Sequence, residues 1–581
     1  MTSARKSFRL ILIKPSHYDD DGYVIQWLRS SMPSNSLAAL YGLAMDCAQR
    51  QVLGPHTDIV VSAHDETNTR IRPERLARDI RAGGGGMVGM VGVQSNQFPR
   101  AMDLARRFRG LGIPVAIGGF HVSGTLAMLP GITEELQEAI DLGITLFAGE
   151  AEDGLEELLR DAAGGTLKPV YNHMARLPNL AGVPIPFLPK AGLKRTAEKM
   201  TTFDAGRGCP FQCSFCTIIN VQGRVSRRRT PDDVEAIVRH NVAQGVHSFF
   251  ITDDNFARNK DWEPIFDRLI ALREGEGIRL KCTIQVDTLC HRIPRFIEKA
   301  GRAGVVRVFI GLESINPQSL LGAKKQQNRI GEYRRMLLVW KAIRAVTWAG
   351  YIIGFPADTP ESVMRDIGII QRELPIDFLE FFALTPLPGS EDHQKLTLAG
   401  VDMDADLNRY DTFHVVTAHA RMRRETWEAT YWEAWKRYYT QAHMETLMRR
   451  AAATGISLGK MLTMLLSFWG LSLVEHMHPL EGGYLRRKVR TERRPGLGIE
   501  PIWRFWPVYV GDVLSKHARI AAMAARLLRL RYRLKHDPEA RRYRDLALTP
   551  VEETGTLELL AGVGVVPPAA ESRHDLLPSG S

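Results

Sequence analysis

Two series of short apolar runs that alternate with helical patterns constrain the fold of this 581-residue chain. In the first series the apolar runs cover residues 8–14, 58–62, 87–93, 115–119 and 144–148. Strands that alternate with helices form a parallel sheet covered on both faces. Five such units predict a flavodoxin-like, doubly wound domain over residues 1–165.

A second series follows a proline-rich segment, residues 166–199, which we interpret as an extended linker. Its strand candidates are residues 201–205, 248–252, 281–285, 307–312, 347–353 and 378–384. Six units in residues 200–395 predict a partial (β/α)6 barrel, because a closed barrel of eight units needs about 250 residues. Active sites of such barrels lie at the carboxyl ends of the strands.

Residues 396–581 lose this alternation and predict a mainly helical, basic C-terminal region that ends in a mobile tail of about 30 residues. Between Arg486 and Arg544 there are 17 Lys and Arg against 5 Asp and Glu, which accounts for the net charge of +11. With 44% hydrophobic residues the chain is not a disordered or fibrous protein. Six cysteines are too few for a disulfide scaffold. We therefore expect a cytoplasmic enzyme with reduced thiols.

Two segments of the C-terminal region could meet a membrane. Residues 456–474 carry one charge, Lys460, and we favour a buried helix there over an interfacial helix or a membrane span. Residues 513–535 form a basic amphipathic pattern, preceded by Trp503, Phe505 and Trp506. We favour a solvated basic face over a packed apolar stripe; peripheral contact with the inner membrane face is the alternative. No RNA-binding module is recognisable, so nucleic acid is not favoured as a partner.

Three cysteines in a C-x3-C-x2-C window, Cys209, Cys213 and Cys216, directly follow the first predicted barrel strand. A loop of this spacing can bring three thiolates to one [4Fe–4S] cluster and leaves one iron without a protein ligand. The alternative is a zinc site, which prefers four ligands. The other cysteines, Cys47, Cys282 and Cys290, are interpreted as buried structural residues, with a substrate-site thiol at Cys282 or Cys290 as the alternative.

The cysteine window resembles the radical S-adenosylmethionine (SAM) superfamily, with Phe215 at its aromatic position. The resemblance implies that the open iron chelates SAM, and that an electron from the cluster cleaves SAM to methionine and a 5′-deoxyadenosyl radical. Further motifs of the superfamily recur at the ends of later strands. They imply SAM contacts by Phe215, Asp253, Asp254, Asn255, Glu313, Ser314, Ile352 and Gly354. Singly, these motifs also fit a helix N-cap or an ordinary buried ion pair.

A doubly wound domain before such a barrel resembles the cobalamin (B12)-binding-domain subfamily of radical SAM enzymes. The resemblance implies a cobalamin site with Ser95, Gly118, Gly119, Gly149 and Glu150 at the strand ends. The motif D-x-H-x-x-G, which supplies a histidine to cobalt, is missing around His17. We therefore expect cobalamin without a histidine ligand, and a domain that has lost cobalamin is the alternative.

The resemblance favours a cobalamin-dependent enzyme that methylates an unactivated carbon of a small or lipid-like substrate. It implies a [4Fe–4S] cluster, SAM and cobalamin as cofactors and an electron donor such as flavodoxin or ferredoxin. A radical SAM oxidase or cyclase that does not methylate, for example one acting on a tetrapyrrole, is the first alternative. A cluster- and cobalamin-containing sensor without turnover is the second. The sequence identifies no catalytic residue beyond these cofactor contacts.

Overall fold

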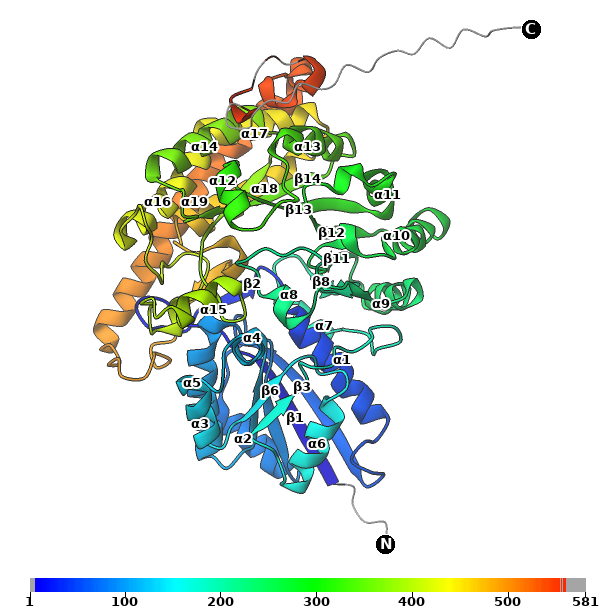
Figure 1. Cartoon of the computed structure of the whole chain (residues 1–581), viewed down its shortest axis with the longest axis vertical. Coiled ribbons are helices and arrows are strands. Elements are labelled where there is room, and N and C mark those ends of the chain that lie inside the picture. The colour runs from blue at the N-terminus through cyan, green and yellow to red at the C-terminus, as the bar shows by residue number, and fades with distance from the viewer. Residues whose placement is uncertain (1–5, 554, 556, 561–581) are drawn as a thin grey trace, which may run out of the picture.

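The structure is a computed structural model that describes residues 6–553, 555 and 557–560. Two α/β domains are joined by a linker, and a helical region packs beside the second one (Figure 1). The predicted mobile tail lies largely outside the described residues. The predicted fold class, a doubly wound domain followed by a partial barrel and helices, is confirmed.

The N-terminal domain is a parallel sheet in the order β3-β1-β4-β5-β6-β7. Five of its strands are those predicted from the apolar runs: β1 (Lys6–Lys14), β3 (Thr57–Asp65), β4 (Gly86–Met90), β5 (Val115–Gly118) and β6 (Thr145–Ala148). Their order is that of a flavodoxin-like fold. A sixth strand, β7 (Val170–Asn172), pairs with β6 and lies inside the segment predicted to be linker. A three-residue strand is too short to give a periodic signal.

Helices cover both faces of this sheet. The helices α1 (Asn35–Gln49) and α6 (Leu155–Gly164) pack on one face. On the other face lie α2 (Pro73–Ala82), α3 (Phe98–Gly110) and α5 (Glu134–Asp141). A short helix, α4 (Phe120–Met128), begins at the carboxyl end of β5 and stands toward the second domain.

The second domain is an open barrel of six parallel strands in the order β15-β14-β13-β12-β11-β8. All six were predicted: β8 (Met200–Phe203), β11 (Ser248–Ile251), β12 (Lys281–Val286), β13 (Val305–Glu313), β14 (Val346–Ile353) and β15 (Phe378–Ala383). Helices α9 (Pro231–Ala243), α10 (Trp262–Ile270), α11 (Phe296–Ala303), α13 (Tyr333–Ala342) and α14 (Pro360–Glu373) connect them. The edge strands β8 and β15 do not pair, so the carboxyl ends of the strands form an open arc.

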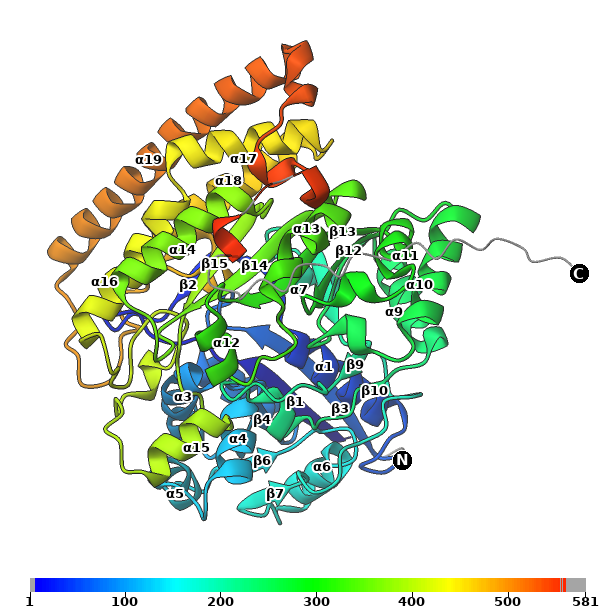
Figure 2. The same ribbon diagram turned by 45° about the horizontal axis from the view of Figure 1, so that its top comes forward.

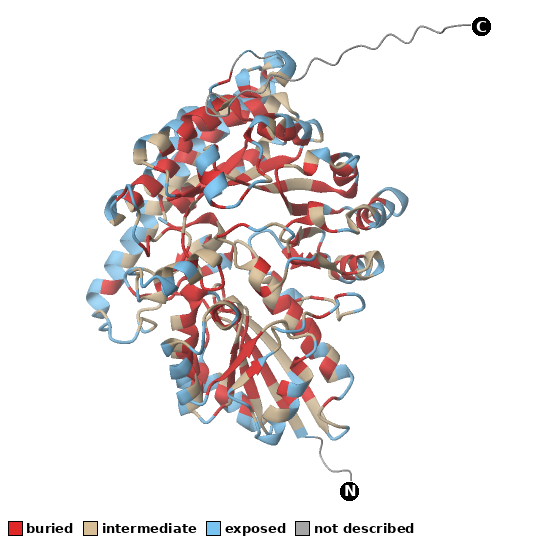
Figure 3. Ribbon diagram, viewed as in Figure 1, coloured by how far each residue is buried: buried red, intermediate tan, exposed pale blue. Residues whose placement is uncertain are grey.

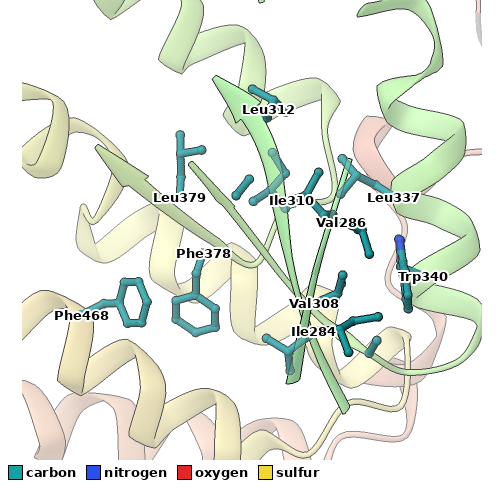
Figure 4. Close-up of a cluster of buried hydrophobic side chains, with 14 of the residues drawn as sticks. Ile284, Val286, Val308, Ile310, Leu312, Leu337, Trp340, Phe378, Leu379 and Phe468 are labelled. Atoms are coloured by element: carbon teal, nitrogen blue, oxygen red, sulfur yellow. The ribbon is translucent and has the colours of Figure 1, made fainter. Parts of the chain in front are cut away.

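The barrel core is apolar on both sides of the sheet. Leu337 and Trp340 of α13 pack against the β12 and β13 side chains on one side (Figure 4). On the other side Phe378 of β15 contacts Phe468, with ring centroids 4.7 Å apart. Phe468 belongs to α18 (Leu458–Leu473), so the helical region packs against this side of the open barrel.

The C-terminal region consists of α16 (Arg424–Tyr438), α17 (Gln441–Ala453), α18 and the 35-residue α19 (Ile502–His536). Helix α18 buries Met461, Leu465 and Phe468, which confirms the prediction of a buried helix over residues 456–474. Buried residues gather in the interior of both α/β domains and of the helical region (Figure 3). Among the described residues, no helix is both long and apolar enough to cross a bilayer.

One connection between distant parts of the chain had no sequence signal. Strand β2 (Gln26–Ser30) pairs antiparallel with β16 (Gly483–Arg487), and its Trp27 is buried. Thus the predicted helical region contributes a strand, and that strand ties it to the N-terminal domain. Pairing between segments so far apart depends on tertiary packing, which local periodicity cannot reveal.

Candidate active site

The three cysteines of the C-x3-C-x2-C window lie on one loop at the carboxyl end of β8. The loop leaves the strand through the two-residue strand β9 (Gly206–Arg207) and turns at Gly208, whose φ is +91°. A Cβ at Gly208 would lie 2.7 Å from the Val225 carbonyl oxygen, so only glycine fits this turn. The Cys209 amide then donates to the Gly223 carbonyl at 3.2 Å, which fixes the start of the loop.

The thiols of this loop are held away from solvent. Burial raises the pKa of Cys209 to about 11 and that of Cys216 to about 12, and Cys213 is buried. Thiolates in such surroundings need a cation, which a metal centre supplies. In the described residues, no three His, Cys, Asp or Glu side chains converge on the position of a single metal ion. Thiolates that each bind a separate iron of one cluster need no such convergence, so the loop fits a [4Fe–4S] centre.

A lysine that the sequence analysis missed lies beside this loop. The ammonium of Lys325 is 5.7 Å from the centroid of the Phe215 ring and forms an ion pair with Glu313. Although burial opposes the charged form, the Glu313 carboxylate and the thiols of Cys213 and Cys216 hold the pKa of Lys325 above its usual value. No motif marks this lysine, because it follows α12 (Pro317–Gly322) and not a strand.

Glu313, which is predicted to contact SAM, lies at the carboxyl end of its strand. It ends β13 with a φ of +62°, after a shift in the pairing register with β14. A Cβ on Gly311 would meet its Oε1 at 2.8 Å, and one on Gly350 would lie 3.8 Å from its Oε2. Two glycines therefore leave room around the carboxylate. The next residue, Ser314, is buried, and its hydroxyl accepts a hydrogen bond from the Asn316 amide at 3.0 Å.

The predicted SAM contacts after β11 make hydrogen bonds to the protein itself, two to backbone amides and one to a carboxylate. Asp253 accepts from the Ala205 amide at 2.7 Å, and Asp254 accepts from the Gly208 amide at 3.2 Å. Burial raises the pKa of Asp253 to about 7 and that of Asp254 to about 6. Asn255 donates to Asp287 at 2.9 Å. These three side chains thus position the cysteine loop and the end of β12.

The end of β14 contributes an apolar wall next to the cysteine loop. Ile352 and Phe355 are buried in a small cluster that Phe215 borders, and the rings of Phe215 and Phe355 are 6.3 Å apart. Gly354 has a φ of +117°, and a Cβ there would lie 1.7 Å from the Trp427 ring. The structure therefore brings together Phe215, Glu313 and Ile352 from three separate segments, as the motifs predicted.

A cavity of about 170 Å³ lies in the N-terminal domain between the sheet, α1 and α6. Four of the five residues predicted to bind cobalamin line it: Gly118, Gly119, Gly149 and Glu150. The remaining lining is mostly apolar and includes Leu10, Leu12, Ala39, Ala116, Leu155 and Leu158. This mostly apolar cavity lies at the carboxyl ends of a flavodoxin-like sheet, where ligands of this fold class bind.

Ser95, the fifth residue predicted to bind cobalamin, and His17 lie outside this cavity. Ser95 is buried, and its Oγ lies 3.2 Å from Nδ1 of His121. The Nε2 of His17 lies 3.4 Å from a carboxylate oxygen of Glu481. Neither residue lines the cavity.

Glu150 has a second role that the sequence did not suggest. Its carboxylate accepts from Arg207 at 2.6 Å and also pairs with Arg227, and both arginines belong to the barrel domain. Glu152 adds a further bond to Arg207 at 2.8 Å. Because Arg207 stands two residues before Cys209, these pairs connect the rim of the cavity to the cysteine loop.

Comparisons with known proteins agree with this site. Residues 205–368 match the model of the radical SAM superfamily. The chain is 29% identical over 321 residues to bacteriochlorophyllide d C-12(1)-methyltransferase of Chlorobaculum tepidum, a match that covers 54% of this chain and 66% of that protein. It is 24% identical over 355 residues to hopanoid C-2 methylase of Rhodopseudomonas palustris, with 57% and 63% covered. Each match spans just under two thirds of the relative.

A solved structure reproduces the whole architecture. The radical S-adenosylmethionine methyltransferase TsrM from Kitasatospora setae, with cobalamin and a [4Fe–4S] cluster bound, aligns with a TM-score of 0.54 at 14% identity. The alignment covers 89% of this chain and 100% of that chain. Residues 205–368 are therefore a radical SAM domain, and the chain as a whole shares the fold of that cobalamin- and cluster-containing enzyme.

Proposed function

We propose that the protein is a cobalamin-dependent radical SAM enzyme that methylates an unactivated carbon. The observation that carries the proposal is the connection between the two sites: Glu150 lines the cavity of the N-terminal domain and pairs with Arg207, two residues before Cys209. A methyl carrier and a radical source must both reach one substrate carbon, so an enzyme of this kind needs the two sites at one interface.

We assign each cofactor to a separate set of residues. Cys209, Cys213 and Cys216 would hold a [4Fe–4S] cluster, with SAM beside it and the tail of cobalamin in the cavity; bound there, these groups supply the radical and the transferred methyl group. Glu313 and Lys325 form an ion pair beside the cysteine loop, and we expect these two charges to bind the amine, carboxylate or ribose of SAM. Phe215 and Ile352 border the same region with apolar side chains, and we expect them to limit the access of water to SAM.

The substrate is proposed to be a small or lipid-like molecule. The relatives are named for carbon methylation of a tetrapyrrole and of a hopanoid, and both substrates are largely apolar. An external donor such as flavodoxin or ferredoxin would reduce the cluster. The three cysteines outside the window, Cys47, Cys282 and Cys290, are free and buried. We place the protein in the cytoplasm, with peripheral contact to the inner membrane face.

The proposal is tested with protein purified anaerobically and supplied with iron, sulfide and cobalamin. It is reduced with dithionite and incubated with methyl-labelled SAM and either bacteriochlorophyllide or a hopanoid-containing lipid extract. Methylation predicts S-adenosylhomocysteine, 5′-deoxyadenosine and label in the organic extract. An oxidase or cyclase would yield 5′-deoxyadenosine without S-adenosylhomocysteine, and a sensor would yield neither.

A variant with Cys209→Ala, Cys213→Ala and Cys216→Ala serves as the inactive control. It should lose the absorbance near 400 nm and all SAM cleavage. A triple variant that retains its iron would contradict the assignment of the ligands. The triple variant of Cys47, Cys282 and Cys290 to Ala is the matched control and should keep the cluster.

A further inference from the structure

The long helix α19 has an apolar stripe along the face that points away from the molecule. Five large apolar side chains on this stripe are exposed: Trp503 by 77%, Val510 by 47%, Leu514 by 65%, Leu528 by 49% and Tyr532 by 68%. Their spacings of seven, four, fourteen and four residues are those of one helical face. Ala521 and Ala525, also exposed, fill the gap between Leu514 and Leu528.

This stripe is opposite to the face that packs on the protein. The packed face buries Phe505, Met523, Leu527, Leu530 and Leu534, and it contacts α17 and α18. Leu514 follows Phe505 by nine residues, and Tyr532 follows Met523 by nine, a separation of half a turn at about 100° per residue. In Figure 2, α19 runs along one edge of the molecule, with α17 and α18 on its inner side. The helix thus has two apolar faces, of which the protein covers one.

The apolar surface is widest at the start of α19. Ile502 and Trp506 are exposed by 60% and 51%, next to Trp503. Leu497 and Ile499, in the segment just before the helix, are exposed as well. Exposed tryptophans are costly in water, and they are favoured where an apolar phase meets a polar one.

Cations line both sides of the stripe. Helix α19 contains eight Lys and Arg and one acidic residue, Asp512, which lies on the packed side and pairs with Lys516 at 2.8 Å. Seven of the cations have no carboxylate partner among the described residues. Arg519 and Arg526 donate to the Leu473 carbonyl and the Gln441 side chain. The other five also lack a side-chain hydrogen bond in this part of the chain: Arg504, Arg529, Arg531, Arg533 and Lys535. By helical position, Arg504, Arg529 and Arg533 lie on one side of the stripe, and Arg531 and Lys535 lie on the other.

We propose that this outer face of α19 binds the surface of an anionic lipid bilayer. An apolar stripe flanked by unpaired cations is complementary to acyl chains bordered by phosphate groups. The helix would lie in the plane of the interface along about 50 Å. This inference does not depend on the proposed reaction, because binding to lipid is measured without turnover.

Two other occupants fit the face less well. A second copy of the chain would bring two rows of arginine together, and like charges beside an apolar helical seam oppose pairing. Nucleic acid would pair with the arginines, but aliphatic Val510, Leu514 and Leu528 offer neither base stacking nor hydrogen bonds. Both occupants are distinguished from lipid by the experiment below.

The test is flotation of the full-length, cluster-loaded protein with vesicles of phosphatidylcholine alone or mixed equally with phosphatidylglycerol. We expect the protein to float with the mixed vesicles at low salt, and to float much less with pure phosphatidylcholine or at high salt. Leu514→Glu combined with Leu528→Glu should abolish flotation. Arg529→Gln combined with Arg533→Gln should weaken partition to mixed vesicles about thirtyfold.

Matched controls place the same changes elsewhere on the surface. Leu398→Glu alters an equally exposed leucine of α15 (Glu391–Leu398), and Arg75→Gln with Arg78→Gln alters two exposed arginines of α2. Both should float like the parent protein. All substituted side chains are exposed, and unchanged absorbance near 400 nm confirms that each variant is folded.

Three results would overturn the proposal. The parent protein could fail to float with mixed vesicles, or the double glutamate variant could float as well as the parent. The parent could also sediment as a dimer that this variant converts to a monomer, which would assign the face to a contact between copies. If the parent protein fails to float but binds oligonucleotides, and the glutamate changes do not affect that binding, the cations are assigned to nucleic acid.

Discussion

The Glu150 carboxylate accepts a hydrogen bond from the Arg207 guanidinium at 2.6 Å, and both side chains are nearly buried. Glu150 follows β6 of the N-terminal domain, and Arg207 belongs to β9 of the barrel domain. The pair therefore sets the distance between the cavity of one domain and the cysteine loop of the other. The intact buried ion pair contributes little to the net free energy of folding, because burying both charges is costly, but it fixes the relative orientation of the two side chains.

Removing this carboxylate should destabilise the protein. Glu150→Gln leaves Arg227 without a carboxylate partner in the described residues, while Arg207 keeps Glu152 and Asp204. We expect the free energy of unfolding to fall by about 2–4 kcal/mol, measured by urea denaturation. Glu156→Gln is the control, because that partly exposed glutamate pairs with Arg50 and should cost less than about 1 kcal/mol. Equal losses in the two variants would contradict a special role for Glu150.

The ion pair between Lys325 and Glu313 should govern SAM binding but not assembly of the cluster. Lys325→Met removes the charge and keeps the shape of the stem, leaving Glu313 unpaired. We expect a SAM dissociation constant at least about tenfold higher, at unchanged iron content, because a charged partner contributes about 1.5–3 kcal/mol. Binding is measured by calorimetry on the cluster-loaded protein.

The neighbouring lysine provides the control for this experiment. Lys324 is half exposed and pairs with Glu391 at 2.6 Å. Lys324→Met should bind SAM like the parent protein. If both methionine variants bind SAM with the parent affinity, Lys325 is not part of the SAM site.

The motifs at strand ends were sufficient to predict which segments converge, because parallel strands bring their carboxyl ends to one edge. They were insufficient to predict what each side chain does there. Asp253 and Asp254 were expected to contact SAM, but in the structure they accept bonds from the backbone of Ala205 and Gly208. Whether they also touch SAM stays a prediction. The sequence does not reveal whether a carboxylate accepts hydrogen bonds from a ligand or from the backbone of a neighbouring loop.

Local sequence patterns do not predict side-chain contacts between segments that are far apart in the chain. Lys325 lies in no motif, and Glu150 was expected to contact a cofactor before it was seen to pair with arginines of another domain. Gly119 was expected to leave space for cobalamin. A Cβ there would lie 2.1 Å from the Val93 amide nitrogen, so the protein's own backbone already requires the glycine.

Gly354 should be among the least replaceable residues of the barrel. Gly354→Ala combines an unfavourable φ of +117° with a Cβ 1.7 Å from the Trp427 ring. We expect a loss of at least about 3 kcal/mol in the free energy of unfolding, because backbone strain and overpacking add. Gly400→Ala is the control, since its φ is +66° and no atom lies within 4 Å of its Cβ. That variant should lose about 1 kcal/mol, and a similar loss in both would exclude the clash with Trp427.

Filling the cavity of the N-terminal domain should prevent retention of cobalamin. Ala39 of α1 lines the cavity, and Ala39→Trp would occupy much of its 170 Å³. We expect the purified variant to contain the normal amount of iron and less than about a tenth of the parent's cobalamin, read from their absorbance spectra. Met45→Trp, on an exposed position of the same helix, should retain cobalamin. Full retention in Ala39→Trp would show that the tail does not enter this cavity.

The stability of the protein should fall between neutral and alkaline pH because of His414. Its Nδ1 lies 2.7 Å from Asp411, and its Nε2 lies 3.1 Å from Asp20 in the loop after β1. Although burial opposes the charged form, the two carboxylates raise the pKa of His414 to about 10. A folded pKa above the unfolded value gives stability that is complete below about pH 6.5 and is lost as the pH rises through 10.

We expect this loss to be at most about 5 kcal/mol, because about 3.5 pH units at about 1.4 kcal/mol each set its upper limit and solvent screens the share of Asp20, which is 81% exposed. The measurement is the free energy of unfolding in urea at a series of pH values, compared between the parent and His414→Gln. The difference between the two proteins should be largest at pH 6 and vanish near pH 10. Burial lowers the pKa of His291, so His291→Gln should leave the slope between pH 6.5 and 10 unchanged. A difference between the parent and His414→Gln that stays constant up to pH 10 would show that His414 is neutral in the folded protein.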